Sequence, residues 1–293
     1  MRNDRWPLLS AGLLSLLTSS GPRGPEAKDA GRLLRTFQGH SKAVNHVAFS
    51  PDGKRLASAG CDQKVVLWDA DGGQKVRTHD ANEGGECAGS VAFSPDSKWL
   101  VAAGELVPAG SEESIRIWDA PSGEKRRTLR GHVNGIFSVT FSPDGKILAT
   151  AGSQEGEIIL WDFVTGCKLF TLEPKTDRIW AITFRPNFNT LVSGGEDGMI
   201  RLWDVASGRE QRTLRAHARE VMSVAFRTDG KLLASASRDG EVKLWDYPSG
   251  KELHAFKGHS GAITGVVFHP AGQQLATASF DHTVRLWDVG GAR

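Results

Sequence analysis

Hydrophobic and polar positions alternate along most of this chain in short runs that return at a fixed interval. Each unit carries a Phe two residues after a β-branched aliphatic residue, which is the period-2 pattern of a half-buried strand. A turn such as Pro51-Asp52-Gly53 follows, then two further apolar runs and a fourth, more basic run. Each unit therefore predicts four antiparallel strands. The Phe positions are Phe49, Phe93, Phe141, Phe184, Phe226 and Phe268.

Six Trp-Asp pairs set the length of the unit. The tryptophans are Trp68, Trp118, Trp161, Trp203, Trp245 and Trp287, at intervals of 50, 43, 42, 42 and 42 residues. Four strands repeated with a period near 40 residues are typical of a propeller blade. We therefore expect an all-β fold, a six-bladed β-propeller of four-stranded antiparallel blades over residues 32–289, in which neighbouring units share one continuous core.

With its Gly-His and Trp-Asp landmarks, the chain resembles the WD-repeat β-propeller family over residues 32–289. The resemblance implies a non-enzymatic member, which we expect to be of bacterial type. It also implies a hydrogen-bonded tetrad in each blade, in which Asp holds His, His meets Ser or Thr, and that hydroxyl meets Trp. Three repeats match it throughout: His40, Ser58, Asp62 and Trp68; His217, Ser235, Asp239 and Trp245; and His259, Thr277, Asp281 and Trp287.

The other three repeats depart from the tetrad. Glu155 replaces Asp beside His132 in the third, Lys175 replaces His in the fourth, and Gly84 and Glu112 stand at the His and Asp places of the second. We expect the second blade to be the least rigid. Ser, His and Asp within reach of one another resemble a hydrolase triad. Because the group recurs and Trp occupies the hydroxyl, we interpret it as structural and expect no catalytic residues.

The two ends of the array predict how the ring closes. Residues 32–40 match the fourth-strand segments, such as residues 125–132, and the array ends just after a third strand. We therefore expect residues 33–37 to pair with residues 284–287, which would remove two free sheet edges. The alternative is an open ring completed by dimerisation. We favour a monomeric disc.

The first strand of each repeat predicts a candidate binding surface. Two of its inward aliphatic residues are three positions apart, which breaks the period of two and predicts a β-bulge. In the family, the bulge residues face the top rim of the channel, where varied side chains indicate a partner-binding face. The alternative is that the large side chains plug the channel. The candidate residues are Asn45, Phe137, Arg178, Trp180, Glu220, Met222, Arg238 and Phe280.

Composition and charge narrow the partners. The net charge of +2 gives no overall field that would favour nucleic acid. Cysteines at 61, 87 and 167 show no paired spacing, which argues against a disulfide framework and a zinc site, and we expect small buried or half-buried residues. We expect no metal and no cofactor.

The outer-strand arginines are interpreted as solvated charges that block strand pairing: Arg126, Arg127, Arg130, Arg212 and Arg215.

The first 31 residues lie outside the array. Arg2 and Arg5 precede an apolar run over residues 8–17, and small residues follow. This is the layout of a secretory signal peptide over residues 1–21, and the run is too short to span a bilayer. We favour export, with a disordered leader on a cytoplasmic protein as the alternative. Residues 22–31 are interpreted as a linker and 290–293 as a tail.

These features favour a non-catalytic scaffold that binds proteins or peptides on its top face. The alternative is an enzyme or small-ligand binder that uses the mouth of the central channel. Against that alternative, the sequence has no G-x-S-x-G, H-E-x-x-H, P-loop or EF-hand motif. Nucleic-acid binding would need a strongly basic face.

Overall fold

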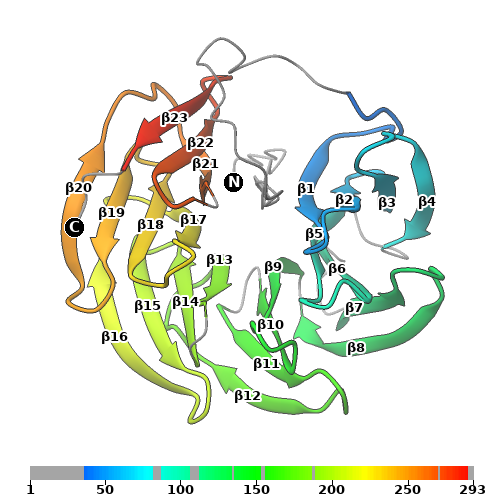
Figure 1. The fold of residues 1–293 in the computed structure, drawn as a ribbon. Coiled ribbons are helices and arrows are strands. Elements are labelled where there is room, and N and C mark those ends of the chain that lie inside the picture. The colour runs from blue at the N-terminus through cyan, green and yellow to red at the C-terminus, as the bar shows by residue number, and fades with distance from the viewer. Residues whose placement is uncertain are drawn as a thin grey trace, which may run out of the picture.

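The computed structural model describes residues 36–81, 87–105, 112–133, 135–152, 156–186, 189–269 and 271–289. These residues form 23 strands and no helix. The strands make six antiparallel sheets arranged around a centre, as Figure 1 shows. The six-bladed propeller predicted from the sequence is confirmed.

Blades 1 to 3 each contain four strands in sequence order, with the first strand innermost. Blade 1 consists of β1 (Val44–Phe49), β2 (Arg55–Gly60), β3 (Lys64–Asp69) and β4 (Lys75–Asp80). Blade 2 consists of β5 (Cys87–Phe93), β6 (Trp99–Glu105), β7 (Glu112–Asp119) and β8 (Lys125–Val133). Blade 3 consists of β9 (Ile136–Phe141), β10 (Ile147–Gly152), β11 (Ile158–Asp162) and β12 (Lys168–Leu172).

Blades 4 and 5 repeat this order, whereas blade 6 has three strands among the described residues. Blade 4 consists of β13 (Ile179–Phe184), β14 (Thr190–Gly195), β15 (Met199–Asp204) and β16 (Arg209–Arg215). Blade 5 consists of β17 (Val221–Phe226), β18 (Leu232–Ser237), β19 (Val242–Asp246) and β20 (Lys251–Phe256). Blade 6 consists of β21 (Ile263–Phe268), β22 (Gln274–Ser279) and β23 (Val284–Asp288).

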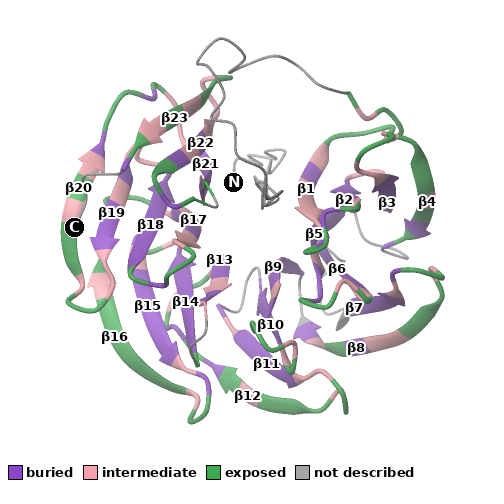
Figure 2. Ribbon diagram, viewed as in Figure 1, coloured by how far each residue is buried: buried purple, intermediate pink, exposed green. Residues whose placement is uncertain are grey.

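The core lies between blades. One face of blades 2 to 6 carries the Phe and Trp residues of the blade, and this face packs on the aliphatic face of the preceding blade. Phe93 and Trp118 of blade 2, for example, share a buried cluster with Ala59 and Leu67 of blade 1. Figure 2 shows the middle strands largely buried and the outermost strands largely exposed. Burial of apolar area between blades therefore stabilises the whole ring.

Hydrogen bonds between innermost strands join the blades near the centre. A hydroxyl of one blade accepts a backbone N–H of the next blade: Ser90 from Val139 (3.2 Å), Ser138 from Ile182 (3.3 Å) and Ser223 from Val266 (3.2 Å). In blade 1, the Nδ1 atom of His46 takes this place and accepts the N–H of Val91 at 3.4 Å. These contacts were not predicted, although the serine recurs at one position of the repeat in three blades.

Arginines of the outer strands make a second link. Arg127 donates to the carbonyl of Phe163 at 3.4 Å, and Arg212 donates to that of Pro248 at 3.2 Å, each across to the following blade. Gly166 and Gly250, in the turns beside these arginines, have φ angles of 76° and 72°, which residues other than glycine rarely adopt. These two arginines of the outer strands therefore also link neighbouring blades, which the sequence did not predict.

The remaining outer-strand arginines fit the sequence interpretation better. Arg126 forms an exposed ion pair with Glu124 at 3.0 Å. Arg130 and Arg215 are exposed. Exposed ion pairs contribute little to stability. The main effect of these charges is therefore to hinder pairing of the outer strands with other strands.

Blade 6 presents a face that differs from its equivalents. Val284 and Leu286 are 71% and 60% exposed, whereas the matching residues of the other five third strands are at most 3% exposed. Of the predicted closing strand, residues 33–35 lie outside the described residues. Phe37 is not in a strand, and its ring packs edge-on against Trp68 at 5.5 Å. Closure by residues 33–37 stays a prediction.

Other sequence predictions also fall outside the described residues. They include the leader over residues 1–21, the linker over residues 22–31, the tail over residues 290–293, and the tetrad positions Gly84 and Glu155. Glu112 begins strand β7, and its backbone pairs with Val133 of β8. In the part of the chain that the structure covers, no helix is long and apolar enough to cross a membrane.

Candidate partner-binding face

The predicted bulges occur in all six innermost strands. The pairing of first and second strand shifts register at the expected place in each blade. The residues at the shift are Asn45, Gly89, Phe137, Trp180, Met222 and Thr264. Because a bulge adds one residue to one strand only, it turns that side chain away from the regular ladder.

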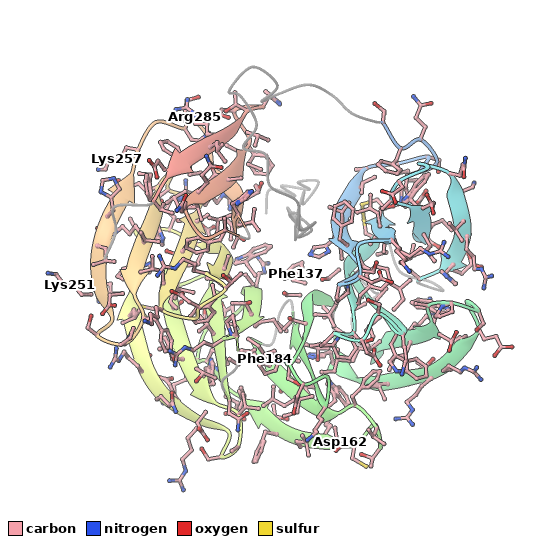
Figure 3. The ribbon with its side chains drawn as sticks, viewed as in Figure 1. Phe137, Asp162, Phe184, Lys251, Lys257 and Arg285 are labelled. Atoms are coloured by element: carbon pink, nitrogen blue, oxygen red, sulfur yellow. A yellow bond between two sulfur atoms is a disulfide. The ribbon has the colours of Figure 1, made fainter. Side chains whose placement is uncertain are left out.

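Two aromatic bulge residues contact each other across blades 3 and 4. The rings of Phe137 and Trp180 stack with their centres 4.5 Å apart and their planes 15° from parallel. Figure 3 shows Phe137 near the middle of the ring. Phe137 is 8% exposed, which agrees with the plug alternative, whereas Trp180 is half-buried and keeps accessible surface. The Nε1 atom of Trp180 is buried and has no hydrogen-bond partner among the described residues.

Asn45 is not available as a partner contact. It is 1% exposed, and its side-chain amide donates to the carbonyl of Ala88 at 3.3 Å. Asn45 and Phe137 are therefore corrections to the predicted set, because contacts with the adjacent blade bury both side chains. Met222 and Phe280 are half-buried, so they keep part of the surface expected of them.

Charged residues of the predicted set pair with one another. Arg178 faces Glu196 in blade 4 at 3.5 Å, and Glu220 faces Arg238 in blade 5 at 2.8 Å. Arg178 and Glu220 hold one position of the repeat, and their partners hold another, so the positive and negative charges are exchanged between blades 4 and 5. Each arginine keeps donors that these contacts do not use, because a guanidinium has five N–H groups.

A disulfide at the same rim corrects the prediction for the cysteines. Cys61 in the turn after β2 is bonded to Cys87 at the start of β5, so the bond joins blade 1 to blade 2. Cys167 is free and exposed, not buried. Spacing could not reveal the pair, because the two cysteines occupy different positions of two successive repeats.

The three complete tetrads are formed as the resemblance implied. The distances from His to Asp, His to hydroxyl and Trp to hydroxyl are 2.8, 2.7 and 2.8 Å in blade 1; 3.1, 2.8 and 2.9 Å in blade 5; and 2.7, 2.8 and 2.9 Å in blade 6. The hydroxyl in each tetrad lies inside the blade. Ser235, for example, is fully buried, so it is not placed to attack a substrate.

The carboxylate of the blade 5 tetrad is stabilised as an anion. Burial alone would raise the pKa of Asp239, but hydrogen bonds from His217 and from the N–H groups of Glu241 and Ala218 lower it to about 2. The charge is thus held by fixed donors at the blade edge. This arrangement fits a structural clamp on the loop before β17.

Blades 3 and 4 show what replaces a complete tetrad. In blade 3, His132 meets Thr150 at 2.8 Å, and its buried Nδ1 atom has no hydrogen-bond partner among the described residues, which do not include Glu155. Burial, with a smaller contribution from Lys168, lowers the pKa of His132 to about 3. In blade 4, Lys175 is exposed, and Asp197 instead forms an ion pair with Arg201 at 2.6 Å.

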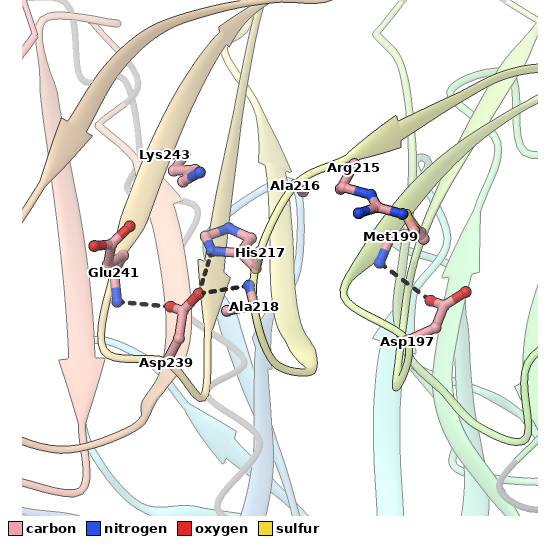
Figure 4. A pocket seen from close by; sticks show the side chains of 9 residues that line it. All are labelled: Asp197, Met199, Arg215, Ala216, His217, Ala218, Asp239, Glu241 and Lys243. Carbon is pink, nitrogen blue, oxygen red and sulfur yellow. Dashed lines mark hydrogen bonds and ion pairs between the residues drawn. The ribbon is translucent and has the colours of Figure 1, made fainter.

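A pocket of about 670 Å³ lies where blades 4 and 5 meet. Figure 4 shows His217 and the N–H groups of Ala218 and Glu241 directed at Asp239, and the N–H of Met199 directed at Asp197. The carboxylates that line this pocket are therefore engaged by the protein itself. No group of His, Cys, Asp or Glu residues in the described ranges could hold a metal ion.

Comparison with known families agrees with this geometry. The family model described as "WD domain, G-beta repeat" matches residues 31–69, 73–119, 123–162, 166–204, 208–246 and 250–288. These six matches cover most of the sequence. The chain therefore belongs to the WD-repeat family.

Individual relatives share only short stretches with this chain. A small ribosomal subunit protein RACK1 from Medicago sativa is 43% identical over 74 residues, which are 25% of this chain and 22% of that protein. WD repeat-containing protein 1 from Xenopus tropicalis is 46% identical over 71 residues, 23% of this chain and 11% of that protein. The match thus spans less than a quarter of either relative. Both are eukaryotic proteins, so the expected bacterial type is unsupported.

Proposed function

We propose that this protein is a non-catalytic interaction scaffold that binds proteins or peptides on the top face of blades 3 to 6. The observation that carries the proposal is the set of bulges, whose positions are constant while their side chains differ from blade to blade. Binding residues are commonly presented by irregular segments on a rigid frame. Relatives named as ribosomal subunit proteins belong to a larger assembly, which supports the same role.

Trp180 is the proposed centre of this face. Its half-buried indole is held flat against Phe137, so little side-chain entropy remains to be lost on binding. The exposed part of the indole ring, which stacks on Phe137, is available for an apolar contact with a partner. Trp and Arg are the residue types that most often dominate interface energies, and Arg178 lies two positions before Trp180.

The compartment and oligomeric state belong to the same proposal. We favour a monomeric disc in an oxidising compartment. The Cys61–Cys87 bond supports this placement, because disulfides persist outside the reducing cytosol. Mass spectrometry of protein from its native host tests the leader directly, since export requires removal of residues 1–21. An intact N-terminus would instead support the cytoplasmic alternative.

Exchange of Trp180 for Ala tests the binding face. Purified chain would serve as bait in an extract of the native host, and captured proteins would be quantified by mass spectrometry. We expect Trp180→Ala to reduce capture of the specific partner about 30-fold, as for a residue worth about 2 kcal/mol at an interface. The disc should keep its thermal unfolding midpoint within a few degrees.

The matched control is Val164→Ala, in an exposed turn at the opposite end of blade 3. This change also shortens an apolar side chain, but we expect it to leave capture unchanged. Loss of capture with Val164→Ala and normal capture with Trp180→Ala would place the binding face at the other end of the ring. Turnover of a small molecule that depends on Trp180 would favour the channel-mouth alternative.

A further inference from the structure

A second pocket, of about 420 Å³, lies on the top face where blades 5 and 6 meet. Four connections build it: the loop before β17, the β18–β19 turn, the loop before β21 and the β22–β23 turn. They contribute Arg219, Arg238, Ala262 and Phe280. Gly240 and Gly261 also line it, and their lack of side chains leaves space above the two arginines.

The two arginines have hydrogen-bonding capacity to spare. Glu220 lies between them, with Oε1 at 2.8 Å from Nη1 of Arg238 and Oε2 at 3.8 Å from Nε of Arg219. The side chain of Glu220 is only 14% exposed, whereas those of Arg219 and Arg238 are 58% and 35% exposed. Glu220 therefore holds Arg238 in an ion pair and lies close to Arg219, which stays mostly exposed. These three side chains carry a net charge of +1, which the Asp239 carboxylate in the same pocket brings to zero.

The remaining carboxylate of the pocket does not compete for these donors. Oδ2 of Asp239 accepts hydrogen bonds from His217 at 3.1 Å and from the N–H of Ala218 at 3.2 Å, and Oδ1 accepts the N–H of Glu241 at 2.9 Å. The pocket thus has unused donors, while its acceptors are satisfied from within. Guanidinium groups in this state favour a carboxylate, which two N–H groups can bind at once.

The other wall of the pocket is apolar. At the positions where blades 4 and 5 carry ion pairs, blade 6 carries Ala262 and Phe280. The backbone N–H of Phe280 donates to the carbonyl of Ala262 at 2.9 Å, which fixes the turn that presents the ring. A ligand that fills this pocket therefore needs an anionic group beside an apolar group. The part of the ligand inside the pocket would be the size of a few side chains.

We propose that this pocket binds an acidic peptide segment, with an Asp or Glu carboxylate on Arg219 and Arg238 and a neighbouring apolar side chain on Phe280. The inference rests on the proposed scaffold function and specifies the chemistry of its partner. A peptide fits better than nucleic acid, because the chain has a net charge of only +2 and the pocket has one apolar wall.

Selection from a random twelve-residue peptide library displayed on phage, with the purified full chain as target, tests the proposal. We expect enrichment of Asp or Glu next to a large apolar residue. In fluorescence anisotropy, Arg219→Gln and Arg238→Gln should each weaken the selected peptide about tenfold or more, as expected for lost charge-assisted hydrogen bonds. Affinity should also fall as salt is added. The matched control is Arg209→Gln, on the exposed outer strand β16, which should bind normally.

The outcomes separate this inference from the proposed function. Neutral or basic peptides, no selected peptide, or equal binding by Arg219→Gln and the control would overturn the acidic pocket. Complete competition by millimolar inorganic phosphate, with equal binding of oligo(dT), would overturn it in favour of a general anion site. The capture experiment with Trp180→Ala decides the scaffold function independently, since Trp180 does not line this pocket.

Discussion

The junction of blades 5 and 6 and the junction of blades 1 and 2 join equivalent faces with different chemistry. Between blades 5 and 6, a complete tetrad holds the connecting loop, Ser223 links the inner strands, and Phe256 packs on Trp287 at 5.3 Å. Between blades 1 and 2, Ala102 stands at the tetrad hydroxyl, His46 links the inner strands, and His79 packs on Trp118 at 5.0 Å.

The difference shows that one backbone arrangement tolerates several kinds of link. The blade 1–blade 2 junction lacks the tetrad hydroxyl but has the Cys61–Cys87 bond at its top rim. A disulfide acts mainly by restricting the unfolded chain, whereas a tetrad satisfies buried polar groups of the folded chain. The stability of the blade 1–blade 2 junction should therefore depend on reductant and acid. That of the blade 5–blade 6 junction should depend on a single hydroxyl.

The largest expected effect is at a complete tetrad, and the blade 5 tetrad is equivalent to the blade 6 tetrad that holds the blade 5–blade 6 junction. Ser235→Ala removes the hydroxyl that serves both His217 and Trp245 and leaves two buried polar groups without a partner. We expect the free energy of unfolding to fall by about 4 kcal/mol, at about 1–3 kcal/mol for each group. Chemical denaturation with an unchanged m-value measures it.

Ser207→Ala, in an exposed turn of blade 4, is the control for removal of a hydroxyl. Its effect should stay within about 1 kcal/mol, because water replaces the lost partner. Equal losses in the two variants would mean that the tetrad is no stronger than a surface turn.

Loss of the disulfide should have the next largest effect. The double change Cys61→Ala and Cys87→Ala opens a loop with a sequence separation of 26 residues. We expect a loss of about 3 kcal/mol from the chain-entropy relation. Reductant should lower the midpoint of the wild type and leave the double variant unchanged. A wild type that runs identically in reducing and non-reducing peptide maps would show that the bond is absent.

These two sites also show what the sequence could and could not predict. Alignment of the six repeats placed every bulge, because those residues hold fixed positions relative to Phe and Trp, and the resemblance to the WD-repeat family implied the three complete tetrads. The disulfide was missed because its cysteines occupy non-equivalent positions in two blades. The link made by Arg127 was missed because a period-2 pattern assigns it to an exposed edge and says nothing about the next blade.

The candidate face was predicted only in part. The sequence located Trp180 and Arg238 on irregular segments at the rim, as the structure does. It could not predict that Asn45 and Phe137 are buried, since burial at a bulge depends on which side chains of the adjacent blade point toward it. Arg219 was missed because it holds no repeated position with a distinctive residue type.

Acid should affect the blade 1–blade 2 junction before it affects the other. Burial, with a smaller contribution from Arg77, lowers the pKa of His79 from 6.5 to about 4. Between these values the unfolded chain binds a proton that the folded chain does not, so stability falls as pH decreases from 6.5 to 4. The equivalent position of blade 2 is occupied by Leu129. His79→Leu should therefore be accommodated and should remove this loss of stability in acid.

We expect the gain in unfolding free energy from His79→Leu to be about 1–2 kcal/mol larger at pH 5 than at pH 7.5. His254→Leu, at an exposed position of strand β20, is the control for the exchange of His for Leu. The His79→Leu variant will keep part of the acid sensitivity of the wild type, because it retains His46, whose pKa is also lowered by burial to about 4. A gain that is equal at both pH values would contradict the assignment.

The smallest expected effect comes from Ala102→Ser, which adds a missing tetrad hydroxyl to blade 2 and so tests the comparison most directly. Ala102 is fully buried where other blades carry Ser or Thr, so the indole N–H of Trp118 has no tetrad hydroxyl to accept its hydrogen bond. In the equivalent places, the hydroxyls of Ser58 and Ser235 accept this bond at 2.8 and 2.9 Å. Ala102→Ser should therefore stabilise the chain by up to about 1 kcal/mol.

The adjacent residue provides a matched control for Ala102→Ser. Ala103 is equally buried, but it faces the apolar cluster formed with Ile115 and Leu148. Ala103→Ser adds the same atom with no donor or acceptor in reach, so it should destabilise by about 1–3 kcal/mol. Opposite signs for these neighbours in thermal unfolding would show that blade 2 retains the backbone geometry of a tetrad and lacks only its polar groups. Equal losses would mean that the blade has adapted its packing to the absence of the hydroxyl.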